Sequence, residues 1–144
     1  RPISSAASDV YKRQFLLFAT TLVEAKPERI KVTVENVKLE LYIADTDSSR
    51  ARGLMGIDYL GGNEGMIFFW PSASKKCMWM KNTNLPLSVA FIDQDRTIVQ
   101  INDLQPLSTD SVCSTSERII AAIEMNKDWF EENNLKEGSQ VNLN

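Results

Sequence analysis

The sequence predicts an all-β domain, a sandwich or a barrel, with one or two short helices. Two observations carry this prediction. Apolar and polar residues alternate with period two along several short segments, as they do in strands that bury one face. Turn residues separate these segments, and such a short chain leaves no room for βαβ crossovers.

The first half of the domain contains two alternating strands and a short helix. Residues 30–35 (IKVTVE) and 37–43 (VKLELYI) alternate along their whole length, which predicts two half-buried strands. Residues 45–47 (DTD) are N-cap types, and they predict a helix over residues 48–54 with Gly53 near its end.

The second half is predicted to be almost entirely strand. Residues 65–70 (GMIFFW) form a continuous apolar run that we expect to stop at Pro71. The other predicted elements are strands at 77–81, 119–125 and 139–143, a hairpin of 87–93 with 97–101, and one or two helical turns at 128–133.

Two N-terminal segments are not expected to belong to the domain. Residues 4–14 (SSAASDVYKRQ) match one reading frame of a common sequencing-library adapter and transposon end, so residues 1–14 are interpreted as a translated adapter artefact; a genuine basic leader is the alternative. Residues 15–25 (FLLFATTLVEA) have the pattern of a truncated signal-peptide remnant, and a buried first element is the alternative. The signal pattern predicts export to the periplasm or the extracellular space, with a single mature domain at residues 26–144.

Composition excludes several classes of function. The net charge of the chain is −3; it is −5 without residues 1–14, which carry three basic residues and one acidic residue, and −4 after residue 25. An acidic chain without basic runs is a poor candidate for binding nucleic acid or an anionic membrane. The absence of histidine excludes a Ser-His or Cys-His dyad and a histidine-ligated metal. We expect no nucleic-acid partner, no membrane span in the mature chain, and neither a cofactor nor a metal.

Five segments resemble the domain-of-unknown-function family 192 (DUF192). In chain order they are ARGLM (51–55), GMIFFW (65–70), WMKNTNLPL (79–87), FID (91–93) and IEMN (123–126). The resemblance implies a small jelly-roll-like β-sandwich, usually exported in bacteria, with no assigned biochemical activity. The chain departs from the family pattern at Ile57, usually arginine, at Ser88, commonly aspartate, and at residues 127–128, usually Ala-Gly. Family chemistry that needs the first two of those side chains is not carried over.

Sulfur-bearing residues allow two further interpretations. Cys77 and Cys113 are the only cysteines, and an oxidising compartment favours a disulfide between them, with free buried thiols as the alternative. Met55, Met66 and Met80 are expected to fill gaps in the core. Thiol and thioether groups are also soft ligands for Cu(I), so a copper or redox role stays open.

The candidate site is a cluster of charged and polar side chains near the rim of the predicted sheet. Glu124 interrupts an apolar strand, where Ile120 and Ala122 share its face, so its carboxylate needs an ion pair or hydrogen bonds; a glutamate at the sheet edge that faces water is the alternative. We expect it to meet Arg52 or Lys81. The candidate residues are Arg52, Trp79, Lys81, Asn82, Thr83, Asp93 and Glu124. For Asn82, Thr83 and Asp93, a purely structural role in turns is the alternative.

Three classes of function remain open. The first and favoured class is a binding module for an unknown small molecule, glycan or envelope protein, with Trp70, Trp79 and Trp129 as stacking platforms. The second is a hydrolase of envelope or extracellular glycans that uses Glu124 and Asp93 as acid and base. The third is the copper or redox role. Binding is favoured because the sequence supplies neither a nucleophile with a base nor a metal-ligand spacing.

Overall fold

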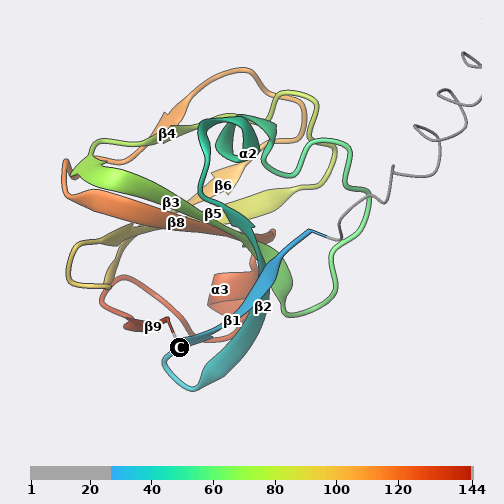
Figure 1. Ribbon diagram of the computed structural model, residues 1–144. Helices are drawn as coiled ribbons and strands as arrows, with labels where there is room; N and C mark the ends of the chain where they lie inside the picture. Colours follow the sequence, from blue (N-terminus) through green and yellow to red (C-terminus); the bar gives the residue numbers. More distant parts are fainter. Residues whose placement is uncertain (1–26, 144) are drawn as a thin grey trace, which may run out of the picture.

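The computed structural model describes residues 27–143, so the two N-terminal segments interpreted as an adapter artefact and a signal-peptide remnant lie outside the described residues. Strands dominate, which confirms the all-β prediction (Figure 1). The elements are β1 (Arg29–Val34), β2 (Val37–Ala44), α2 (Asp47–Arg52), β3 (Glu64–Ser74), β4 (Cys77–Met78), β5 (Leu87–Asp93), β6 (Ile98–Leu104), β7 (Val112–Cys113), β8 (Ile119–Asn126), α3 (Trp129–Glu132) and β9 (Val141–Asn142). Within residues 27–143, no helix has the length and apolar character that a bilayer crossing requires.

Seven strands form one curled sheet with the order β6-β5-β8-β3-β2-β1-β9, and β4 and β7 form a separate two-stranded sheet. The curl makes the large sheet a half-barrel. Its neighbouring strands are antiparallel except for β2 and β3, which pair in parallel through a crossover that contains α2. The expectation that the chain has no room for such a crossover was wrong, because a helix of only six residues is enough to make it.

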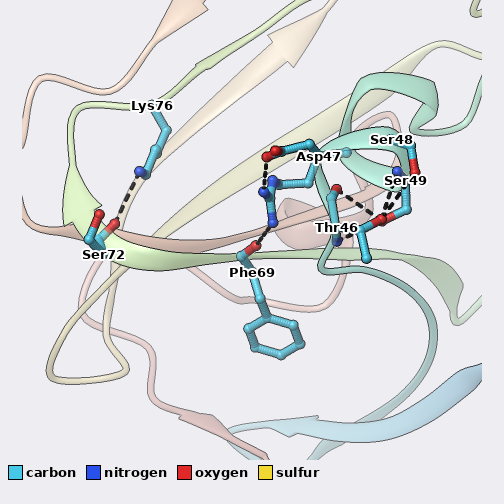
Figure 2. Close-up of polar contacts among 8 residues, drawn as sticks. Thr46, Asp47, Ser48, Ser49, Phe69, Ser72 and Lys76 are labelled. Atoms are coloured by element: carbon cyan, nitrogen blue, oxygen red, sulfur yellow. Dashed lines mark hydrogen bonds and ion pairs between the residues drawn. The ribbon is translucent and has the colours of Figure 1, made fainter.

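Helix α2 begins at Asp47, one residue before the predicted start, and ends at Arg52, two residues before the predicted end. Thr46 is the N-cap residue: its hydroxyl accepts a hydrogen bond from the Ser49 amide at 3.1 Å, and its own amide donates to the Ser49 hydroxyl at 2.9 Å (Figure 2). This reciprocal capping box satisfies two amide groups that the first turn of a helix leaves without partners. The helix ends at Gly53, whose positive φ of 49° turns the chain toward the sheet.

The large sheet buries side chains on both faces. Figure 1 shows α3 on one side of β3 and β8, with α2 and β4 on the other. Ile67 and Ile123 belong to the cluster on the α3 side, which also contains the buried rings of α3. Phe68 follows Ile67 on β3, and Ala122 precedes Ile123 on β8. Both belong to the cluster on the α2 side. Period-two alternation therefore divides each strand between two cores.

The strand prediction needs two corrections next to β4. Strand β3 continues through Pro71 to Ser74, because its pairing with β8 shifts register between Phe69 and Ser74 and the missing amide of proline falls in that irregular stretch. The strand expected at 77–81 ends at Met78, since the next backbone groups bond a loop instead: the Met80 amide donates to the Ser108 carbonyl at 2.8 Å.

Candidate functional site

A pocket of about 240 Å³ lies between α2, the β4 segment and the large sheet. Helix α2 and the loop that follows it form one wall, and β3 contributes aromatic side chains. Glu124 of β8 is its most deeply placed charged group, with 4 % of its surface exposed. The lining residues are Arg50, Ala51, Arg52, Gly53, Leu54, Met55, Phe68, Trp70, Cys77, Met78, Trp79, Met80, Thr83 and Glu124. We call this cavity the Glu124 pocket.

The segments that carry the family resemblance converge on this pocket. Four of the five contribute to its lining, and every residue of ARGLM (51–55) does so. The exception is FID (91–93), which lies in β5 and on its hairpin turn. Sequence reasoning chose only part of the lining, because apart from tryptophan it selected polar residues and interpreted the methionines of the same motifs as core. Membership of those motifs was the available signal for most of the others, whereas Arg50, Cys77 and Met78 lie outside the motifs.

The Glu124 carboxyl group has no protein partner within residues 27–143. No side chain there forms an ion pair or a hydrogen bond with it. Its strand neighbours are Met66 on β3 and Val89 on β5, both apolar. Burial raises the pKa of Glu124 from 4.5 to about 8, because removal from water disfavours the charged form. At neutral pH this carboxyl group is therefore mostly protonated and can donate a hydrogen bond into the pocket.

The expected ion pair of Glu124 with Arg52 or Lys81 is not formed by the described residues. Arg52 lines the same pocket, but it lies at the exposed end of α2. Lys81 lies outside the pocket, where its ammonium group sits 5.4 Å from the centroid of the Trp79 ring. Both cations remain in contact with water, which removes the need to pair with a carboxyl group at the buried end.

The two arginines of the pocket differ in their contacts. Arg50 is held in place: it donates to the Phe69 carbonyl oxygen at 2.7 Å and forms an ion pair with Asp47 at 2.6 Å (Figure 2). The Arg52 guanidinium has neither an ion pair nor a hydrogen bond with any residue of the described part of the chain. Arg52 is thus the cation at the mouth of the pocket that is available to a ligand.

Asn82 and Thr83 make the turn that their residue types suggest. The Thr83 amide donates to the Met80 carbonyl at 3.1 Å, and the Thr83 hydroxyl donates to the Lys81 carbonyl at 3.1 Å. Asn82 has a positive φ of 53°, a conformation that asparagine tolerates better than most residues. Thr83 is buried and lines the pocket, whereas Asn82 is exposed and does not.

Asp93 lies away from the pocket and has a structural role. Its carboxylate accepts hydrogen bonds from the amides of Asp95 at 2.9 Å and Thr97 at 3.2 Å, which closes the β5–β6 turn. Glu124 pairs with Val89, four residues before Asp93, a separation of roughly 13 Å along the strand. The two carboxyl groups of a glycosidase lie roughly 5 to 9.5 Å apart. The acid and base pair considered for the hydrolase is therefore not assembled.

The cysteines form a disulfide that links β4 to β7. Cys77 and Cys113 are directly paired residues of these two antiparallel strands, with Cα atoms 4.0 Å apart. Pairing and free thiols were both left open by the sequence, and the structure contains the pair. Because Cys77 also lines the Glu124 pocket, the disulfide holds one of its walls in place.

Methionine and tryptophan residues divide between core and pocket. Met66 and Met80 are buried, as expected for core fillers, and Met80 also reaches the pocket. Met55 is only half-buried and lines the pocket, so the prediction that it fills the core was wrong. Trp70 and Trp79 line the pocket. Trp129 is not a stacking platform: it is buried on the α3 side, and its ring nitrogen donates to the Asn63 side chain at 3.2 Å.

Similar proteins identify the family. The model of DUF192, described as "Uncharacterized ACR", matches residues 30–143. The chain belongs to DUF192. No protein of curated function matches it.

Two solved structures share the DUF192 fold. A protein from Sinorhizobium meliloti 1021, described as a "putative transcription regulator", superposes with a TM-score of 0.79 at 27% identity, over 83% of this chain and 97% of that one. A protein of unknown function from Novosphingobium aromaticivorans DSM 12444 superposes with a TM-score of 0.74 at 26% identity, over 83% of this chain and 94% of that one.

Proposed function

We propose that this DUF192 protein is a binding module that takes a small organic molecule in the Glu124 pocket. The observation that carries the proposal is a buried carboxyl group that lines a pocket and has no protein partner. Its oxygens can be reached from the pocket, because residues 27–143 contain no fully buried side-chain oxygen that lacks a hydrogen-bond partner. A ligand that accepts a hydrogen bond from Glu124 gives this carboxyl group the partner that the described residues do not supply.

The walls of the pocket suit an organic ligand. Phe68, Trp70 and the methionine side chains supply apolar surface, while Arg52 and Glu124 supply polar groups at separate places. Ligand pockets commonly combine apolar walls with a few polar groups that fix orientation. The volume of about 240 Å³ is below the ~300 to 1,000 Å³ typical of drug-sized ligands, so a metabolite-sized molecule is expected.

The proposal is tested by screening a library of small polar organic compounds against the protein by ligand-observed NMR. Ala51 lies on the exposed side of α2 at the pocket, and Ala51→Trp is designed to fill the pocket. Ser48→Trp is the matched control, because Ser48 is exposed on the same helix and does not line the pocket. Compounds that bind the wild type and Ser48→Trp but not Ala51→Trp support the proposal. A screen without such compounds contradicts it.

We also propose that the protein works outside the reducing cytoplasm, in the periplasm or the extracellular space. The Cys77–Cys113 disulfide supports this, since such bonds persist mainly in oxidising compartments. Thiol labelling of the protein from its native cells, before any reduction, should find both cysteines blocked. Labelled free thiols would contradict the proposal.

Copper binding is a second candidate, favoured by one observation. Met55, Met78 and Met80 line the same pocket, and thioethers are soft ligands that suit Cu(I). Cys77 is removed from this ligand set by the disulfide, and residues 27–143 contain no group of three His, Cys, Asp or Glu placed to hold a metal. Titration of Cu(I) in competition with a chelator tests this candidate, and failure to compete would eliminate it.

A further inference from the structure

The charges around the Glu124 pocket are arranged unevenly. Among the lining residues within 27–143, Arg50 and Arg52 are the only other charged ones, and both come from α2. The lining residues of β3 and β4 are uncharged, as is Val89, the neighbour of Glu124 on β5. The mouth is therefore cationic, and the one acidic group lies at the buried end.

Two lysines outside the lining add to the positive charge. The Lys76 ammonium lies 5.1 Å from the centroid of the Trp70 ring, and the Lys81 ammonium lies 5.4 Å from that of Trp79. Both rings line the pocket, so each already has a cation over it. A cationic ligand would thus meet repulsion at the mouth and aromatic rings that already hold cations.

We propose that the ligand of the Glu124 pocket is a small organic anion whose carboxylate is bound by Arg52 and whose uncharged oxygen accepts a hydrogen bond from the Glu124 carboxyl group. The inference rests on the proposed binding function and adds the class of ligand. Arg52 and Glu124 form no ion pair with each other, so one molecule can satisfy both groups only by spanning the space between them.

The groups at both ends of the pocket are suited to a small organic anion. A guanidinium group presents paired donors that match a carboxylate, and Arg50, already bonded to Asp47 and Phe69, is less available for that role than Arg52. At the other end, burial raises the pKa of Glu124 to about 8. The group is then a donor at neutral pH and adds no negative charge against an anionic ligand.

The experiment uses matched compounds rather than one presumed ligand. Small carboxylic acids that also carry a hydroxyl or carbonyl group are each paired with their primary amide and with the amine of the same skeleton. Binding is measured by ligand-observed NMR at about pH 7 with the full chain. Acids are expected to bind at least about tenfold more tightly than their amides, because only the carboxylate accepts, from the Arg52 guanidinium, charge-assisted hydrogen bonds in which both partners are ionised.

Variants locate the two contacts. Arg52→Gln should weaken binding of the acids by at least about tenfold and abolish the preference for acid over amide. Arg118→Gln is the charge-matched control: Arg118 pairs with Asp95 outside the pocket, so its removal should change affinity less than twofold. Glu124→Leu should weaken binding of the acids at about pH 7, because it removes the donor, and Glu124→Gln, whose amide still donates, should bind them more tightly than Glu124→Leu.

A pH series separates this proposal from other uses of the pocket. Raising the pH from about 6.5 to about 9.5 should weaken binding of the acids by the wild type, because Glu124 loses its donated proton and gains a negative charge near the ligand. Glu124→Gln should show no such dependence. Amines that bind better than acids, or an Arg52→Gln variant with unchanged affinity, would overturn the anion proposal while leaving the binding function intact. Absence of any binding that Ala51→Trp blocks would overturn both.

Discussion

At the scale of single residues, the buried position of Glu124 lowers the free energy of unfolding when its carboxyl group is charged. Its carboxyl group titrates near 4.5 when solvated and near 8 in the folded protein. Between these values the folded state binds a proton that the unfolded state releases. The free energy of unfolding therefore falls as pH rises through this window, and the loss is complete above the folded pKa.

Replacing Glu124 with glutamine should remove this pH dependence. At about pH 4, below the solvated pKa of Glu124, the wild type and Glu124→Gln are expected to have similar free energies of unfolding, because both side chains are mostly neutral in the folded and the unfolded state. At about pH 9 the variant should be more stable by a few kcal/mol, since it carries no buried charge. Urea denaturation at both pH values measures this, and a difference that does not change with pH would show that Glu124 is solvated.

Gly65 on β3 offers a second test at residue scale. A Cβ atom there would collide with the Glu124 carbonyl oxygen and the Met125 sulfur on the neighbouring strand. Gly65→Ala should therefore destabilise the protein by about 1 to 3 kcal/mol, the typical cost of overpacking. Gly62→Ala is the control, since nothing lies within 4 Å of a Cβ at that position. Equal denaturation midpoints for the two variants would contradict the close packing at Gly65.

At the scale of elements, strands were predictable where alternation or an apolar run extends over six or more residues. The sequence located β1, β2, β5 and β8 to within one residue at each end. It did not locate β7, and it made β4 too long, because two-residue strands have no measurable period. These two strands exist as a pair held by the Cys77–Cys113 disulfide and by backbone bonds, which depend on tertiary proximity.

The disulfide should therefore contribute much to the free energy of unfolding, although the sheet that it links has only two short strands. Its cysteines are separated by 36 positions, for which the loop-entropy model gives about 3 to 4 kcal/mol. The double variant Cys77→Ser/Cys113→Ser is expected to lose about this much free energy of unfolding. Addition of a reductant should lower the stability of the wild type to that of the variant and leave the variant unchanged. A reductant effect on both proteins would point to a cause other than this bond.

At the scale of the whole molecule, the sheet is joined near its open ends by the C-terminal segment. The Ile98 amide donates to the Ser139 carbonyl at 2.9 Å, and the Val141 amide donates to the Arg96 carbonyl at 2.8 Å. Strand β9 also pairs with β1, so one short segment contacts strands at both ends of the sheet order, β1 at one end and the edge strand β6 at the other. The sequence predicted a strand here but gave no sign of which strands it joins.

Removal of this segment should weaken the whole domain. A chain that ends at Glu137 loses the buried Val141 side chain and the backbone bonds to β6, and its melting temperature is expected to fall by more than 10 °C, at about 4 to 8 °C per kcal/mol. Deletion of residues 1–25 is the comparison, because the sequence predicts that they are no part of the domain; its melting temperature should stay within error. A large loss on the N-terminal deletion would place the apolar run in the core.

The candidate site could be only partly predicted for the same topological reason. Sequence reasoning selected Arg52, Trp79, Thr83 and Glu124, which do share a pocket. It also included Lys81, Asn82 and Asp93, which do not line it. The pocket depends on the parallel crossover between β2 and β3, which places α2 opposite β8 across the pocket. No local sequence pattern predicts the pairing of β2 with β3. The expected ion pair was inferred from the cost of burying a charge, whereas burial raises the pKa of Glu124 to about 8, which lowers that cost without a cationic partner.

The central place of β8 has a consequence for how the chain is synthesised. This strand pairs with β3 on one side and β5 on the other, yet it follows both in sequence. Until β8 emerges, β3 and β5 each present an open edge, and both strands are rich in buried apolar residues. Open apolar edges favour pairing with other chains, and contacts so distant in sequence form slowly. The strand that carries Glu124 thus also closes the edges through which a nascent chain would aggregate.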